Sequence, residues 1–133
     1  MRLSKRSEYA LLALLYLARQ DPETLVSVET IATAQAIPPQ FLEQILLALK
    51  RAHYLVSSKG QRGGYRLARP ANSFTLADVI RTLDGPLAPT EAVSKYFYRP
   101  TPIEREQSLV ALFTRVRDSM LDILEHTTLA DLL

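Results

Sequence analysis

The 133-residue sequence contains no cysteine. This absence excludes disulfide bonds, thiolate metal sites and thiol-based catalysis. Apolar residues make up 47% of the sequence and charged residues 23%, a balance typical of a globular protein and not of a disordered chain. A chain of this length forms one domain, or a domain with an oligomerisation element, and can bury a substantial core.

Long apolar runs are missing as well. The longest, residues 9–18, falls well short of the roughly 18 residues that a transmembrane helix needs. The N-terminus MRLSKRSEYALLALLYLA superficially resembles a signal peptide, but Glu8 interrupts its basic start and no clear cleavage site follows. We therefore expect a cytoplasmic protein with no membrane partner.

The sequence also lacks the common catalytic and cofactor motifs. No serine stands in a G-x-S-x-G context, and the stretch GQRGG matches neither the phosphate-binding P-loop nor the dinucleotide pattern G-x-G-x-x-G. His53 and His126 are far apart in sequence, and neither has a carboxylate–histidine pattern beside it. We expect no enzymatic activity, no metal site and no cofactor.

Glycine and positive charge are concentrated in one stretch, SSKGQRGGYRLARP at residues 57–70, which holds three glycines and four basic residues. Residues 1–69 contain ten Lys and Arg against five Asp and Glu, whereas residues 70–133 contain six against nine. Polar glycine-rich tips also occur for structural reasons alone, and surface charge can be scattered at random. A basic half is equally typical of a protein that meets an anionic polymer.

Apolar periodicity and capping residues predict a mainly α-helical chain with a small β-hairpin. The expected helices run from Ser4 to about Gln20, from Ser27 to Gln35, from Pro38-Pro39 to about Ala52, over 76–83 and over about 104–125; Thr127 or Thr128 caps a final turn. Strands at 53–58 and 65–69 flank a glycine-rich loop, residues 59–64. Phe41, Leu42 and Ile45 are expected in the core.

The order helix, short helix, tight turn, helix, basic hairpin predicts a winged helix-turn-helix. In this architecture the helix after the tight turn enters the major groove, and the hairpin, or wing, reaches the neighbouring backbone or minor groove. The basic tip therefore lies on the wing, which is the part of this architecture that contacts the nucleic-acid backbone or minor groove.

The chain resembles the Rrf-type (IscR-, NsrR- and CymR-like) bacterial transcription regulators. The matching stretches are MRLSKRSEYALLALLYLA, IPPQFLEQILLALKRAHYLVSSKGQRGGYRLARP, FTLADVIRTLDGPLAP and TTLADLL. The resemblance implies a homodimeric DNA-binding regulator with an N-terminal winged helix-turn-helix and a long dimerisation helix. Many members hold an iron–sulfur cluster on three cysteines, which this sequence lacks, so it resembles the cysteine-free branch.

DNA contacts are expected from three segments. In the helix after the tight turn, here called the reader helix, they are Pro39, Gln40, Glu43 and Gln44. Gln can bond adenine bidentately and Glu can accept a hydrogen bond from cytosine. In the wing they are Lys59 and Arg62, with Gly60, Gly63 and Gly64 allowing close approach to phosphates, while Tyr65 packs the wing. The resemblance further implies phosphate contacts from Ser4, Lys5 and Tyr9. For any one of these residues the alternative is a solvated surface.

Two further sites are expected in the C-terminal half. An apolar stripe at helical spacing predicts a dimer interface formed by Leu109, Leu112, Phe113, Val116, Met120, Ile123 and Leu124. Three adjacent aromatics, Tyr96, Phe97 and Tyr98, either seal their segment against the dimer helices or line a site for a small effector or a regulatory protein. The expected divisions are a DNA-binding domain at 1–85, an irregular linker and sensor segment at 86–103, and the dimerisation helix with a C-terminal turn at 104–133.

The sequence thus predicts a homodimeric, sequence-specific transcriptional regulator, a repressor without an iron–sulfur cluster, that binds a palindromic operator in double-stranded DNA. The alternative is a protein-interaction adaptor that keeps the fold but does not read DNA; salt-steep binding to duplex distinguishes the two. RNA binding is disfavoured because no aromatic stacking platform is evident.

Overall fold

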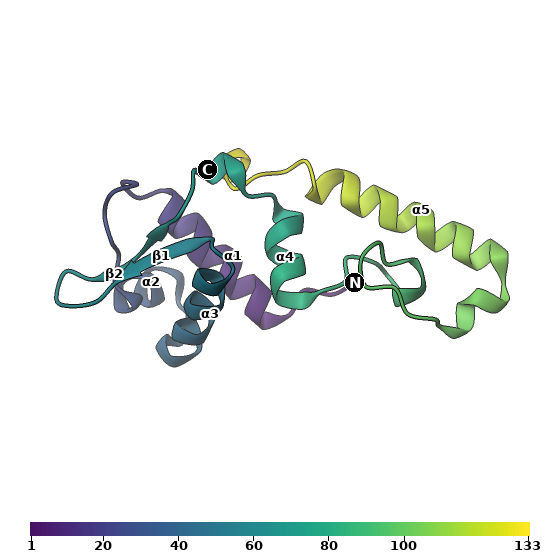
Figure 1. Cartoon of the computed structure of the whole chain (residues 1–133), viewed down its shortest axis with the longest axis horizontal. Coiled ribbons are helices and arrows are strands. Elements are labelled where there is room, and N and C mark those ends of the chain that lie inside the picture. The colour runs from purple at the N-terminus through teal and green to yellow at the C-terminus, as the bar shows by residue number, and fades with distance from the viewer.

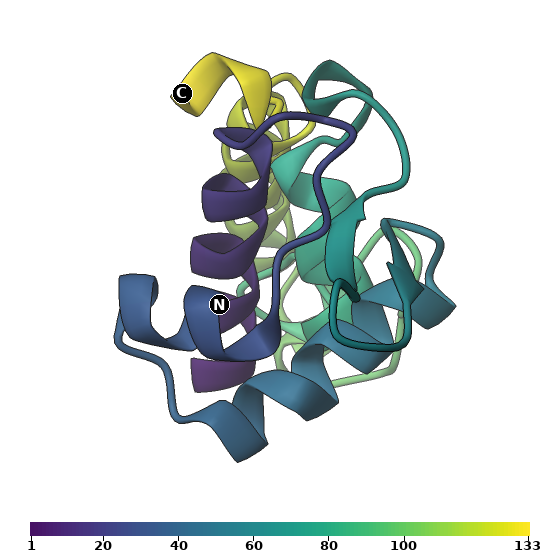
Figure 2. The same cartoon turned by 90° about the vertical axis from the view of Figure 1, so that its left-hand side faces the viewer.

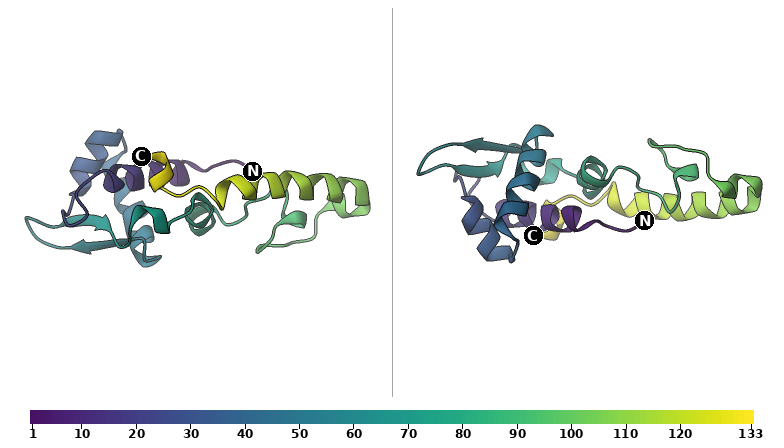
Figure 3. Two further views of the ribbon diagram at one scale, coloured as in Figure 1. Left: turned by 90° about the horizontal axis from the view of Figure 1, so that it is seen from above. Right: turned by 90° about the horizontal axis from the view of Figure 1, so that it is seen from below.

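The computed structural model describes all 133 residues and confirms a mainly helical chain with a winged helix-turn-helix (Figure 1). Its elements are α1 (Lys5–Ala18), α2 (Val28–Gln35), α3 (Pro39–Arg51), β1 (Leu55–Ser58), β2 (Gly64–Leu67), α4 (Leu76–Asp84) and α5 (Gln107–Leu124). Short 3-10 turns cover Ala71–Ser73, Glu91–Val93, Pro102–Arg105 and Ala130–Leu132. The molecule is elongated, with α2, α3 and the wing at one end and the start of α5 at the other (Figures 1 and 3).

Side-chain caps start three helices where the sequence predicts them. The hydroxyls of Ser4 and Ser27 each accept a hydrogen bond from the backbone N–H three residues on, at 3.1 and 3.2 Å. At the start of α4, Thr75 and Asp78 form a capping box, in which each side chain accepts from the other's backbone N–H. Such caps contribute about 1 kcal/mol each and fix where the helices begin.

A sharp turn at Ala36 separates α2 from α3. Ala36 has a left-handed backbone (φ 54°), and two prolines follow, the second of which opens α3. Leu42, Ile45, Leu46 and Leu49 then face the core.

The expectation that Phe41 belongs to the core is wrong. Its side chain is 42% exposed, because position 41 lies at the edge of the face that Leu42, Ile45, Leu46 and Leu49 share. The ring packs edge-on against Tyr9 of α1, with ring centroids 5.6 Å apart.

The wing is an antiparallel pair in which Leu55 lies opposite Leu67 and Ser58 opposite Gly64. Val26, in the loop before α2, exchanges two backbone hydrogen bonds of 2.8 Å with Tyr65, so the wing is fastened to the helical body. The first strand begins two residues later than predicted, since His53 adopts a left-handed conformation (φ 67°) at the end of α3.

The main core joins α1, α2, α3 and the first residues of the wing, and the C-terminus returns to it. Leu129 is fully buried among these residues, and its backbone N–H donates to the carbonyl of Phe74. In Figure 2 the C-terminal turn lies beside the upper end of α1. The last residues of the chain therefore pack with the N-terminal part and not with α5.

Helix α5 contacts the rest of the chain mainly through α4 and the 3-10 turns at Glu91–Val93 and Pro102–Arg105. It starts at Gln107 and not at Glu104 as predicted, because Pro102–Arg105 forms a 3-10 turn. Only Leu121 is buried, against Ala77 and Ile80 of α4 and Leu87. Neither α5 nor any other helix is long and apolar enough to cross a membrane.

Candidate nucleic-acid interface

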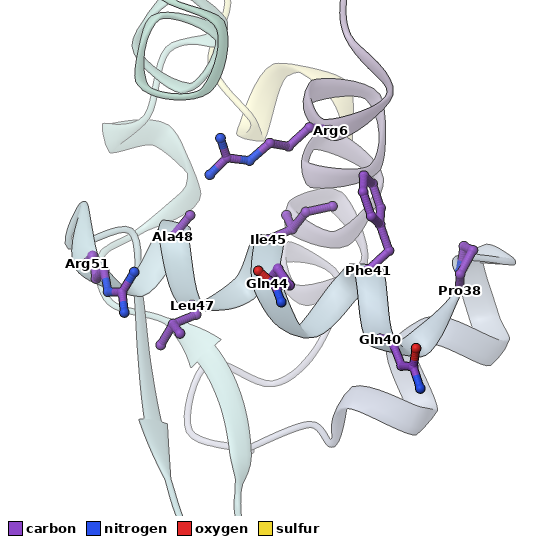
Figure 4. Close-up of a pocket in the computed structure, with 9 residues that line it drawn as sticks. All are labelled: Arg6, Pro38, Gln40, Phe41, Gln44, Ile45, Leu47, Ala48 and Arg51. Carbon is purple, nitrogen blue, oxygen red and sulfur yellow. The ribbon is translucent and has the colours of Figure 1, made fainter.

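The outward face of α3 presents polar side chains at helical spacing. Gln40, Glu43 and Gln44 are exposed, as is Pro39 at the start of the helix. Leu47 and Arg51 continue the same face towards the C-terminal end of α3 (Figure 4). This is the face that the four buried apolar side chains of α3 leave free.

A groove of about 590 Å³ runs along this face. Its lining includes Gln40, Gln44, Leu47 and Arg51 from α3, together with Arg6 from α1. Figure 4 shows the Arg6 side chain extending from α1 over α3 towards Ala48. Two guanidinium groups and two amides therefore border one open surface, which suits phosphates and base edges.

The three N-terminal candidates differ in what they offer. Lys5 is exposed. Tyr9 is half-buried by its contact with Phe41. Ser4 donates both its backbone N–H and its hydroxyl to the carboxylate of Asp84, so neither donor is free for a phosphate in this conformation.

The Ser4–Asp84 contact also sets the ionisation of Asp84. Burial acts to raise the pKa of this carboxyl, but hydrogen bonds from the hydroxyl and backbone of Ser4 outweigh it and hold the pKa below its ordinary value. The nearby charge of Arg6 acts in the same direction. The contact joins the start of α1 to the end of α4.

The wing tip carries exposed cations on a backbone that requires glycine. Lys59 and Arg62 are exposed, and Gly60 between them has a φ of 105°. A Cβ at Gly63 would lie 2.2 Å from the carbonyl oxygen of Ser58. At Gly64 it would lie 2.3 Å from the carbonyl oxygen of Val26. These two glycines are thus needed for the wing's own packing, whatever the wing binds.

A second open groove, of about 640 Å³, connects the wing tip with the start of α2. Arg62 and Gly63 line one side, and Ser27 and Thr30 line the other. Tyr65 of β2 is half-buried and packs against the main core, so it packs the wing, as expected.

The predicted dimer residues form a largely open face on α5. Leu109, Leu112, Val116 and Ile123 are 38%, 48%, 39% and 65% exposed, and Phe113, Met120 and Leu124 are half-buried. An open groove of about 390 Å³ follows this face. Sequence reasoning missed Leu121, which lies outside the stripe and anchors α5 to α4.

The aromatic segment is exposed and adjoins α4. Tyr96, Phe97 and Tyr98 are 62%, 44% and 56% exposed. The Arg81 guanidinium lies 4.7 Å from the centroid of the Tyr96 ring and forms a 2.6 Å ion pair with Glu125. That hydrogen bond lowers the pKa of Glu125. Tyr96 thus lies over a cation that links α4 to the end of α5.

Sequence reasoning also missed Arg6, Leu47 and Arg51 as members of the α3 groove. The signal was present for two of them, because Leu47 and Arg51 follow Gln40 and Gln44 at intervals of three and four residues. Arg6 could not be found in this way, since it reaches the groove from another helix.

Almost the whole chain matches known transcriptional regulators. The family model Rrf2, described as an iron-dependent transcriptional regulator, matches residues 3–133. A helix-turn-helix transcriptional regulator of Mycobacterium tuberculosis, Rv1287, is 40% identical over 134 residues, covering 98% of this chain and 80% of the relative. The transcriptional regulator CymR of Bacillus subtilis is 33% identical over 132 residues, covering 99% of this chain and 89% of CymR.

Solved structures give the same result. The structure of CymR, the global cysteine regulator of B. subtilis, superposes with a TM-score of 0.79 at 31% identity and covers 99% of this chain and 95% of CymR. IscR of T. potens superposes with a TM-score of 0.75 at 27% identity, and the match covers 99% of this chain and 85% of IscR. These likenesses confirm the predicted fold class.

The residues of this chain do not fit the iron site that the family description implies. Iron–sulfur clusters are held by cysteine thiolates, and the sequence has none. No three His, Asp or Glu side chains gather where they could hold a metal ion. The two histidines lie on separate elements, His53 after α3 and His126 after α5.

Proposed function

Because this chain belongs to the Rrf2 family of DNA-binding transcription regulators, we propose that it is a homodimeric, cytoplasmic repressor of a palindromic operator. The observation that carries the proposal is the exposed face of α3, where Gln40 and Gln44 border a groove together with Arg6 and Arg51. A basic wing at the same end of the molecule supports it (Figure 1).

Each exposed segment has its own role in this proposal. Pro39 starts α3, and Gln40, Glu43 and Gln44 contact base edges in the major groove. Lys59 and Arg62 neutralise phosphates or enter the minor groove, while Gly60, Gly63 and Gly64 keep the tip slim enough to approach the backbone. Lys5 and Tyr9 contact phosphates. Ser4 acts through Asp84, by holding α1 against α4.

A second copy of the chain covers the apolar face of α5. An 18-residue helix is about 27 Å long, and its Leu109, Leu112, Val116 and Ile123 side chains are exposed. A twofold dimer built on α5 places two copies of α3 roughly one DNA turn, about 34 Å, apart. We assign residues 1–85 to DNA binding, 86–103 to the linker and 104–133 to dimerisation, with the C-terminal turn packed on the DNA-binding part.

Tyr96, Phe97 and Tyr98 are proposed to bind a small effector or a regulatory protein. The stacking of Arg81 on Tyr96 gives such a ligand a route to α4. A ligand regulates only if it binds two states of the dimer with different affinity. Tyr96→Ala and Tyr98→Ala should alter repression of a reporter in cells while leaving the operator affinity of the purified protein unchanged; unaltered repression in both would leave only a structural role.

The decisive test is selection of bound duplexes from a random DNA pool. The expected result is a palindromic consensus, with log Kd rising steeply and linearly with log salt. Absence of duplex binding would favour the adaptor function instead. Protein prepared without oxygen should be colourless and bind the consensus equally well with or without air; a visible absorption band with stoichiometric iron and sulfide would contradict the cluster-free proposal.

A further inference from the structure

Leu47 is the exposed leucine of α3. Its side chain is 40% exposed, whereas Leu42, Leu46 and Leu49 are fully buried in the same helix. An exposed leucine is not unusual by itself. The position of Leu47 makes it informative, because it lies in the middle of the helix face proposed to enter the major groove.

The neighbours of Leu47 along this face are polar. Gln44 precedes it by three residues, Arg51 follows it by four, and all three line the same groove. In Figure 4 Leu47 projects from the side of α3 that faces away from α1. Phe41, by comparison, is similarly exposed at 42%, but its ring packs edge-on against Tyr9.

An apolar side chain cannot exchange hydrogen bonds with base edges. The apolar group that the major groove presents is the C5-methyl of thymine. Cytosine carries only a hydrogen at the same ring position, and the remaining groove positions would leave a donor or acceptor of the DNA desolvated against leucine, which is unfavourable. Leu47 is therefore matched to one base of the four.

We propose that Leu47 reads a thymine methyl group in each half-site of the operator, an inference that rests on the proposed DNA-reading function. Leu47 lies seven residues, or about 10 Å, beyond Gln40 along the helix axis. Its thymine is accordingly in a different base pair from those that Gln40 contacts.

Replacing thymine by deoxyuridine tests the proposal, since it removes the methyl group and keeps every hydrogen-bonding atom. Each thymine of the selected operator is replaced in turn, in both half-sites together, and Kd is measured by fluorescence anisotropy. At one symmetric position the wild-type protein should lose about fourfold in affinity per half-site, or about tenfold or more per dimer. The Leu47→Ala protein should bind both duplexes with the same, weaker affinity.

Leu12→Ala is the matched control, since Leu12 on α1 is 38% exposed and lies outside the groove. It should retain the full deoxyuridine effect. The inference is overturned if no thymine shows a loss that depends on Leu47, or if the selected half-site requires no thymine. Failure of the wild-type protein to bind any duplex would instead refute the proposed function.

Discussion

Helices α3 and α5 are both amphipathic, but their apolar faces have different environments. In α3, Leu42, Ile45, Leu46 and Leu49 are buried in the main core. In the longer α5 only Leu121 is buried, in a small separate cluster with three residues of α4 and the segment after it. A helix whose apolar face is covered within its own chain can offer its polar face to a ligand. A helix whose apolar face stays open needs another protein surface to cover it.

The largest effect is expected from placing charge on the open face of α5. Phe113→Asp together with Val116→Asp should prevent dimerisation, because two carboxylates per protomer would have to be buried without partners. A monomer carries only one copy of α3 and cannot bind both half-sites at once. The lost bivalent binding should lower operator affinity by roughly a hundredfold or more. Sedimentation and anisotropy measure the two effects. A stable dimer in this variant would show that another surface holds the protomers together.

Truncation of one leucine in each helix tests the comparison directly. Leu46→Ala in α3 should lower the free energy of unfolding by about 2–5 kcal/mol, since it leaves a cavity in a fully packed core. Leu112→Ala in α5 should change the stability of the isolated protomer by only about 0.5 kcal/mol or less, yet weaken the dimer. Chemical denaturation at several protein concentrations separates the two. Equal losses from both would mean that α5 packs within its own chain.

Much of this arrangement could be predicted from the sequence, because its signals are local. Ser4, Ser27 and Thr75 mark helix starts through their own side chains, and the glycines of the wing reflect the backbone of a tight tip. The α5 stripe was found from its spacing. For the helix caps and the α5 stripe the physical cause lies within a few residues, whereas Gly64 is also required by the distant carbonyl of Val26.

Contacts between distant segments could not be predicted in this way. Nothing in the last seven residues indicates that Leu129 is buried beside Phe74, or that Leu121 and not its neighbours anchors α5. Periodicity placed Phe41 in the core because it cannot resolve the edge of a helix face. The pairing of Ser4 with Asp84 spans 80 residues and has no sequence signature.

The wing should contribute to DNA affinity through charge alone, unlike α3. Lys59→Ala and Arg62→Ala should each weaken binding uniformly across sequences and reduce the slope of log Kd against log salt by about one unit per lost phosphate contact. Arg105→Ala is the control, since Arg105 is exposed near the far end of the molecule. Unchanged affinity and slope in both wing variants, measured by anisotropy from low to high salt, would refute the wing assignment.

The smallest effect concerns Asp84, which ties α1 to the end of α4 and thus joins the DNA-reading part to the part that leads to α5. Its pKa is lower in the folded protein than the ordinary value of 3.8, so the folded state keeps this carboxylate charged at more acidic pH than the unfolded chain does. The stabilisation is therefore complete above about pH 4 and is lost as the pH falls through the folded-state pKa.

Asp84→Asn should destabilise the protein modestly at neutral pH, and its unfolding free energy should fall less steeply below pH 4 than that of the wild type. Glu43→Gln, a change at an exposed carboxylate without a hydrogen-bond partner on the protein, serves as control and should keep the wild-type acid slope. Urea titrations at fixed protein concentration between pH 2.5 and 7 provide the measurement. If Asp84→Asn and the wild type lose stability in parallel on acidification, the Ser4–Asp84 contact does not hold α1 to α4 in solution.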